Sequence, residues 1–168
     1  MTNRRAYKKS WPAKNLGEVI NFLERMHPEG LYVKKIAEMT DMTQQNISAL
    51  FSRDNMKLSK AEMIADKYGY KLRLFFPTKT YLEGLSAPPP KRLFPNAGNL
   101  SGLAQYINDC NYSINFVSER MHRYPYMLTK AFQTGDILLS NLYETLDTLN
   151  INVIWQFTPK KDDNKDKQ

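Results

Sequence analysis

The feature that most constrains the fold is an internal repeat. A shift of 81 residues aligns 31–76 with 112–157 without a gap, yet only six of these 46 positions are identical. The repetition lies instead in the apolar pattern, and seven pairs of apolar residues coincide: Val33/Ile114, Ile36/Val117, Ile47/Leu128, Met56/Ile137, Ala61/Leu142, Leu72/Val153 and Leu74/Trp155. Such self-similarity predicts two copies of one small folding unit in the 168 residues.

The first copy, residues 15–77, has the spacing of four short helices followed by a strand. Apolar positions three and four apart form the inward stripes of these helices. The stripes are Leu16/Val19/Ile20/Leu23, Val33/Ile36/Ala37/Thr40, Ile47/Leu50/Phe51 and Met63/Ile64/Tyr68. Three polar residues, Asn15, Thr43 and Ser59, stand where the first, third and fourth helices need an N-cap. The second copy, 97–158, is expected to follow the same order.

Each copy ends in an alternating segment that predicts a strand with one buried face. In 70–76 the apolar face holds Leu72, Leu74 and Phe76, and 151–157 alternates in the same way. A lone short strand leaves its backbone groups unpaired, so we expect the two strands to pair antiparallel. Pairing within one chain gives a monomeric pseudo-dimer in which the third helices of the two copies lie about 34 Å apart, while exchange between chains gives a homodimer.

Basic residues are concentrated in the first half. The chain has 24 Lys and Arg against 17 Asp and Glu, a net charge of +7, which favours a polyanionic partner. Residues 1–84 hold fifteen basic and nine acidic residues, whereas 97–158 hold three and five. The segment 1–14 has five basic residues and no acid. It is predicted to be a basic arm along a phosphate backbone or, alternatively, a disordered start.

Two further segments lack the composition of a core. Residues 78–96 contain Pro88-Pro89-Pro90 and are predicted to be a semi-rigid linker. Residues 159–168 are highly charged and are predicted to be a disordered tail.

Several function classes find no support in the sequence. There is one Cys and there are two His, so we expect no disulfide framework, no metal site and a reducing, cytoplasmic compartment. No nucleophile, acid/base pair or phosphate-binding Gly-rich loop stands out, so we expect no catalytic residues, no cofactor and no enzyme. No run of about 18 apolar residues occurs, so we expect no membrane partner.

The segment Ile36–Ser48, with its Thr-Gln-Gln-x-Ile run, resembles the core of the lambda-repressor-like, or Cro-type (XRE family), helix-turn-helix proteins. The resemblance covers 15–76. It implies a mainly α fold of two tandem lambda-repressor-like helix-turn-helix domains, each followed by a short β-strand. It also implies that the helix starting at Thr43 enters the major groove of double-stranded DNA.

The residues of this helix fit that role. A Gln amide carries a donor and an acceptor and can pair bidentately with adenine, which points to Gln44 and Gln45. Short polar groups able to reach base edges or phosphates are Thr43, Asn46 and Ser48. Basic residues near the ends of the helix, where phosphates run, are Lys34, Lys35, Arg53 and Lys57.

The second copy departs from this pattern. Its equivalent segment is Arg123–Lys130, in which Pro125 is expected in the first helical turn. Either Arg123, Thr129 and Lys130 contact DNA, or the copy is degenerate and serves pairing or a protein partner. The sequence thus favours a DNA-binding transcription regulator of bacterial or phage origin. The alternatives are an antitoxin that binds DNA and a toxin, and a protein-interaction adaptor.

Overall fold

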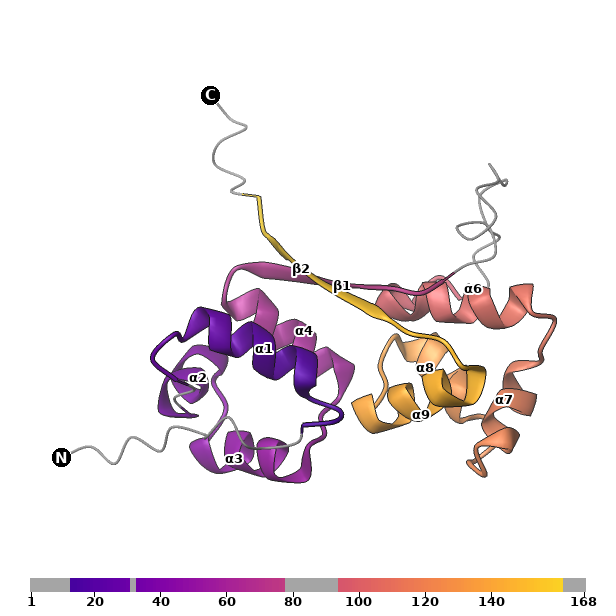
Figure 1. Cartoon of the computed structure of the whole chain (residues 1–168), viewed down its shortest axis with the longest axis horizontal. Helices are drawn as coiled ribbons and strands as arrows, with labels where there is room; N and C mark the ends of the chain where they lie inside the picture. Colours follow the sequence, from indigo (N-terminus) through magenta and orange to yellow (C-terminus); the bar gives the residue numbers. More distant parts are fainter. Residues whose placement is uncertain (1–12, 31–32, 78–93, 162–168) are drawn as a thin grey trace. The chain divides into compact units, whose positions relative to one another are not determined.

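The computed structural model describes residues 13–30, 33–77 and 94–161 and is mainly helical with one small sheet (Figure 1). The first copy contains α1 (Gly17–Met26), α2 (Val33–Thr40), α3 (Gln44–Arg53), α4 (Leu58–Lys67) and β1 (Tyr70–Phe75). The second contains a short 3-10 helix, η1 (Gly98–Leu100), then α6 (Ser101–Asp109), α7 (Ile114–Arg120), α8 (Met127–Thr134), α9 (Leu139–Leu149) and β2 (Ile154–Pro159). Most of the predicted arm, linker and tail lies outside the described residues.

The backbone turns at the same places in both copies. Four residues of the first copy with positive φ have counterparts with positive φ 81 positions later: Gly30/Asn111, Asp41/His122, Asp54/Gly135 and Gly69/Asn150. This left-handed conformation is costly for most residues and is tolerated best by Gly, Asn and Asp. The two copies therefore share a chain path although few of their side chains are identical.

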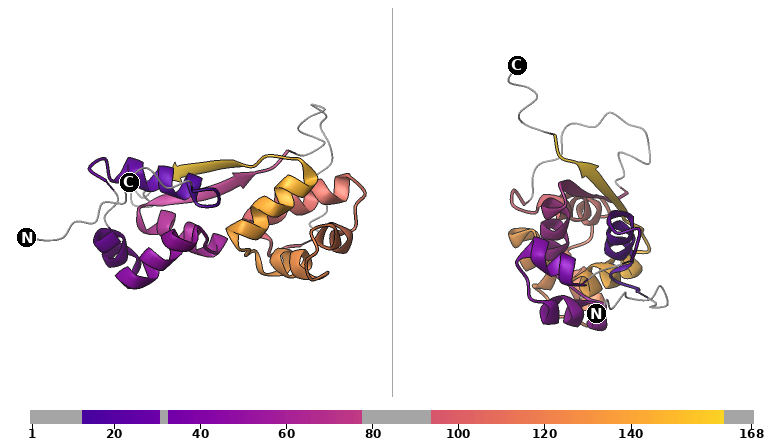
Figure 2. Two further views of the ribbon diagram at one scale, coloured as in Figure 1. Left: turned by 60° about the horizontal axis from the view of Figure 1, so that its bottom comes forward. Right: turned by 90° about the vertical axis from the view of Figure 1, so that its left-hand side faces the viewer.

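The two strands form the predicted antiparallel pair within one chain, and Figure 2 shows the pair from two further directions. Just beyond the strands, the Lys160 N–H donates to the Gly69 carbonyl at 2.9 Å. As the alternation predicts, Leu72, Leu74 and Phe76 are buried while Lys71 and Arg73 are exposed. The prediction for 151–157 needs correction, because β2 begins only at Ile154 and the apolar face of this segment is half-buried.

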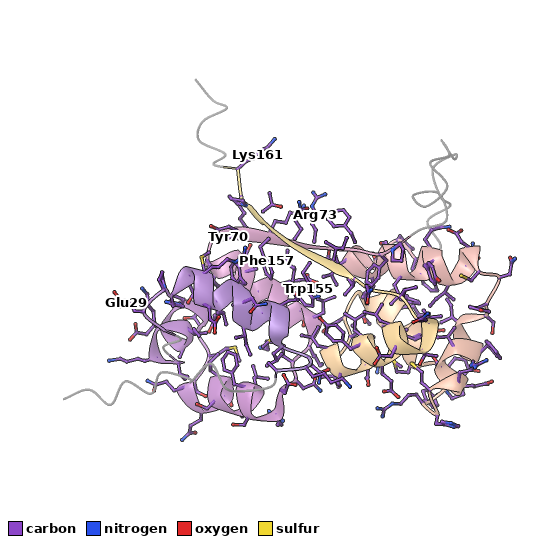
Figure 3. The ribbon with its side chains drawn as sticks, viewed as in Figure 1. Glu29, Tyr70, Arg73, Trp155, Phe157 and Lys161 are labelled. Carbon is purple, nitrogen blue, oxygen red and sulfur yellow. The ribbon has the colours of Figure 1, made fainter. Side chains whose placement is uncertain are left out.

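The described residues form two compact units, and each includes the end of the strand that belongs to the other copy. The first unit falls within Met1–Met56, Lys60–Leu72 and Phe157–Gln168. Its core packs around Phe22 of α1, which stacks on Phe157 and meets Tyr70 edge-on. Tyr70 and Phe157 are labelled in Figure 3.

The second unit comprises Lys57–Ser59 and Arg73–Gln156. Here the end of β1 approaches α6: the Leu74 N–H donates to Asn99 Oδ1 at 3.1 Å, and Phe76 is buried beside Gly102, where an added Cβ would stand 3.2 Å from the ring. Lys57 forms an antiparallel bridge with Leu138 in this unit.

Three of the predicted helix starts need correction. Asn15 does not cap α1: the N-cap is Leu16, and the Asp54 carboxylate accepts the backbone N–H groups of Asn15 and Leu16. Ser59 does not cap α4, which begins at Leu58, because its N–H and hydroxyl both donate to the Asp136 carboxylate. Pro125 does not lie in the first turn of α8. That helix starts at Met127, after a tight turn in which the Met127 N–H bonds to the Tyr124 carbonyl.

Candidate nucleic-acid interface

The side of α3 opposite its polar face packs against α2. The inward residues of α2 are buried as predicted, and Ile47 and Phe51 of α3 are buried as well, while Leu50 is only half-buried. Between the helices Asp41 takes a φ of 55°, and Thr43 caps α3 as predicted by accepting the Asn46 N–H on its Oγ1 at 3.1 Å. The turn at Asp41 and the Thr43 cap together define where α3 starts.

The first turn of α3 presents side-chain amides to solvent. Gln44, Gln45 and Asn46 are exposed, Thr43 is exposed at the cap, and Ser48 is half-buried one turn further on. The structure thus brings together, on one helix end, the five polar residues that the sequence selected as base or phosphate readers. No acidic residue lies within α3.

Three of the four predicted basic flanks belong to the same pair of helices. Lys34 and Lys35 are exposed in the first turn of α2, and Arg53 is exposed at the end of α3 with its Nε donating to the Ala49 carbonyl at 3.3 Å. The acids in 33–53 are Glu38 and Asp41, so the segment carries three cations and two anions. Lys57 is not part of this set, because it belongs to the second unit.

Asp54 was not among the residues that the sequence pattern predicted for this site. It follows α3 in the left-handed conformation, and its carboxylate accepts the backbone N–H groups of Lys14, Asn15 and Leu16 at 2.8 to 3.1 Å. These three hydrogen bonds hold residues 14–16 against the end of α3. Nothing in the local sequence signals the contact, because its partners lie about 40 residues away.

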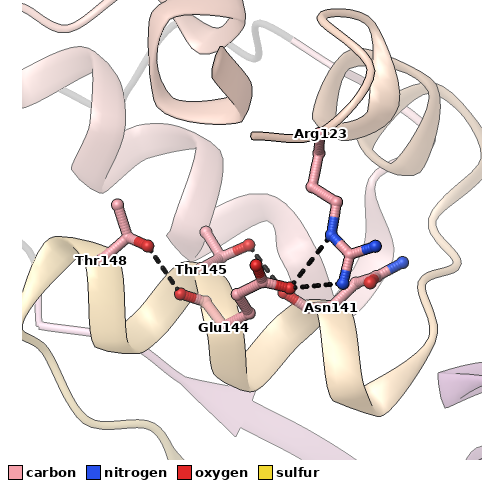
Figure 4. A network of polar contacts seen from close by, with 5 residues as sticks. All are labelled: Arg123, Asn141, Glu144, Thr145 and Thr148. Carbon is pink, nitrogen blue, oxygen red and sulfur yellow. Dashed lines mark hydrogen bonds and ion pairs between the residues drawn. The ribbon is translucent and has the colours of Figure 1, made fainter. Parts of the chain in front are cut away.

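The residues predicted to contact DNA from the second copy are engaged differently. Arg123 donates from Nη2 and Nε to one oxygen of Glu144, at 2.8 and 3.1 Å (Figure 4). Thr129 donates to Asn115 Oδ1 at 3.2 Å, and Lys130 is exposed. Two of the three side chains are thus used within their own unit.

In the second copy, aromatic residues stand where the first copy has exposed polar residues at the start of α3. Tyr124 is 70% exposed and Tyr126 is 54% exposed, and the 81-residue shift makes them the counterparts of Thr43 and Gln45. Their rings contact each other with centroids 5.5 Å apart. Equivalent positions of the repeat are therefore polar in the first copy and aromatic in the second.

The described residues contain no candidate metal site and no candidate membrane-spanning helix. Within 13–30, 33–77 and 94–161 no group of three or more His, Cys, Asp or Glu side chains is placed to hold a metal ion. In the same part of the chain no helix has both the length and the apolar character needed to cross a membrane.

Comparison with known proteins adds no relative. No family model, no curated protein and no solved structure matches the chain.

Proposed function

We propose that the chain is a sequence-specific DNA-binding regulator of transcription that reads the major groove with α3 and works in the cytoplasm of a bacterium. The observation that carries the proposal is the cluster of exposed amides of Gln44, Gln45 and Asn46 at the start of a helix whose opposite side is buried. An α-helix fits the major groove, and Gln and Asn amides pair bidentately with adenine there. This is the role that the resemblance to lambda-repressor-like proteins implies for these residues.

The basic residues support the same proposal. Lys34 and Lys35 at the start of α2 and Arg53 at the end of α3 are exposed, and they would meet phosphates on both sides of an inserted helix. Phosphate contacts supply affinity and orientation, and the amides supply the choice of sequence.

The second copy is proposed to contribute little to reading DNA. Its equivalent positions hold Tyr124, Pro125 and Tyr126, which offer few hydrogen-bonding groups to base edges. Arg123 is already bonded to Glu144, so a phosphate would have to compete for it. We therefore assign sequence recognition chiefly to the first copy.

The decisive experiment is selection of bound sequences from a random pool of duplex DNA. Gln44→Ala and Gln45→Ala should each cost about 1–3 kcal/mol on the preferred site and relax the preference at one or two base pairs. Gln133→Ala is the matched control, because Gln133 is an exposed glutamine on α8 of the second copy. An unchanged preference in both α3 variants would contradict the assignment of α3 as the reading helix.

A second candidate is an antitoxin that binds DNA and also a partner protein, and a third is an adaptor without a DNA role. The exposed rings of Tyr124 and Tyr126 favour a protein contact in either case. A gel shift on random duplex DNA at several salt concentrations separates the adaptor from the other two, because only a DNA-binding protein gives a salt-dependent shift.

A further inference from the structure

The second unit exposes four aromatic side chains around α7, which we call the aromatic surface: Tyr112, Phe116, Tyr124 and Tyr126. They are 47%, 42%, 70% and 54% exposed. They form two pairs, with ring centroids 6.0 Å apart for Tyr112 and Phe116 and 5.5 Å apart for Tyr124 and Tyr126. One pair lies at the start of α7 and the other just after its end, so about 10 Å of helix connects them.

These rings do not fill the core of their unit. The inward side of this segment is occupied by Val117, Ser118, Met121 and Leu128, all of which are buried. Large apolar side chains gathered on a surface usually mark a binding site, and Tyr, Phe and Arg are enriched in protein interfaces. Arg120 adds to the surface, with its guanidinium carbon 5.8 Å from the Phe116 ring centroid.

In the first copy, three of the equivalent positions hold polar residues. At the positions of Phe116, Tyr124 and Tyr126 it has Lys35, Thr43 and Gln45, and all three are exposed. The fold therefore does not require aromatic residues at these positions. Aromatic residues at these three positions are therefore specific to the second copy.

The charges around the aromatic surface are nearly balanced. On α7, on α8 and in the turn between them, the exposed charged residues are Glu119, Arg120, Arg123 and Lys130, and Arg123 is paired with Glu144. One anion and two cations remain, which gives neither the dense positive charge that nucleic acid requires nor strong repulsion between two copies of the surface. A self-complementary contact is compatible with this balance.

The exposed area of the four rings is also comparable to the area that a protein–protein interface buries on one partner. A fully buried aromatic side chain contributes 150–250 Å², so the exposed fractions amount to about 400 Å² on each chain. A standard interface buries about 800 Å² on each partner. The four rings thus supply about half of the area that such an interface buries on each partner.

We propose that the aromatic surface is the interface through which two copies of this chain associate about a twofold axis. The purpose of the dimer rests on the proposed function: a regulator with one reading helix per chain needs a second chain to contact both halves of a palindromic site. The association itself needs no DNA. It can be measured separately.

The test is the oligomeric state of the full chain by analytical ultracentrifugation without DNA. The wild-type protein is expected to be a dimer. Phe116→Lys combined with Tyr126→Gln, the residues that the first copy carries at the equivalent positions, should raise the dimer dissociation constant about 30-fold or more. Tyr124→Thr alone, matched to Thr43, is a second variant in case the double variant folds poorly.

Phe75→Lys is the control, because Phe75 is 47% exposed on β1 and lies outside the aromatic surface. It should leave the dimer intact. A monomeric wild-type chain would overturn the proposal, and so would a dimer that withstands the aromatic variants but is lost on Trp155→Asp, which would indicate strand exchange. A monomer that binds single-stranded DNA through Tyr126 would assign the surface to nucleic acid instead.

The outcomes also separate this proposal from the proposed function. If the protein dimerises through the aromatic surface but binds no DNA, only the DNA-binding role fails. If the aromatic variants and the wild type bind a single half-site equally well but the wild type is monomeric, only the dimer fails.

Discussion

Phe157, in β2 of the second copy, stacks on Phe22 in α1, with ring centroids 4.3 Å apart and planes 12° apart. The guanidinium of Arg25 lies 5.9 Å from the same Phe157 ring. Phe76, the counterpart of Phe157 in the first copy, is buried in the second unit beside Gly102 of α6. Each unit thus packs a phenylalanine that belongs to the other copy of the repeat, buried in the case of Phe76 and half-buried in the case of Phe157.

Phe157→Ala should therefore destabilise the protein well beyond the loss of a surface ring. We expect the free energy of unfolding to fall by about 2–3 kcal/mol, because a half-buried ring and a stacked aromatic pair are lost together. Urea unfolding followed by circular dichroism measures the change. Phe75→Ala, at an exposed position of β1, is the control and should cost less than about 1 kcal/mol. Equal effects of the two substitutions would mean that the stacking does not stabilise the fold.

The helices of this fold follow from the spacing of apolar residues. Val33, Ile36, Ala37 and Thr40 were predicted to share the inward face of one helix, and all four are buried in α2. The alternation in 70–76 likewise gave the correct buried face of β1. Both patterns are local, and burial of an apolar stripe is the strongest single force acting on a short helix or strand.

Helix starts and partners were less predictable because they depend on distant residues. Asn15 had the right type for an N-cap, but the acceptor near α1 is Asp54, and Ser59 bonds to Asp136 across 77 positions. Alternation also shows which face of a strand is buried without showing which helix covers it. The exchange of Phe76 and Phe157 could therefore not be inferred from the sequence.

One signal of the shared chain path was present in the sequence. The four pairs of left-handed positions are occupied by Gly, Asn, Asp and one His, the residue types most tolerant of positive φ. The turn-forming residues of the two copies therefore coincide at the same 81-residue shift as the apolar residues.

Asp54→Gly should destabilise the protein through the lost carboxylate rather than through strain. Gly135 occupies the equivalent position with a φ of 70°, so glycine suits this backbone. Three N–H groups would lose a charged acceptor, and we expect a loss of about 1–2 kcal/mol, since the site is partly exposed to water. Urea unfolding measures it. Asp54→Asn keeps one acceptor oxygen and should fall between the wild type and the glycine variant.

A buried histidine predicts a loss of stability in acid. His27 is 5% exposed and hydrogen-bonds to Tyr68, and burial, together with the nearby Lys35, holds the pKa of His27 below its usual 6.5. The unfolded chain therefore binds the proton more readily, so stability is fully present above about pH 6.5 and falls as the pH drops.

His27→Gln should flatten this dependence between about pH 7.5 and about pH 5.5, measured as the free energy of unfolding in urea. His122→Gln is the control, because His122 is exposed in the turn after α7, and its variant should keep the wild-type slope. A His27 variant with an unaltered slope would show that this histidine is not the group responsible.

Burial also raises the pKa of Tyr68 to about 12, so stability should decrease again as the pH rises above 10.

The cations at the start of α2 should set affinity for DNA without setting its sequence preference. Replacing Lys34 and Lys35 together with Ala removes two exposed charges that we expect to neutralise phosphates. Each phosphate contact contributes about 0.9 to the slope of log K against log salt concentration, so the slope should decrease in magnitude by about 2. Lys67→Ala is the control, since Lys67 is exposed on α4, away from the proposed reading helix in sequence, and it should leave the slope unchanged. Fluorescence anisotropy at several salt concentrations gives the slope, and selection from random DNA gives the preference. A changed preference in the double variant would mean that the two lysines read bases, and an unchanged slope would mean that DNA does not approach α2.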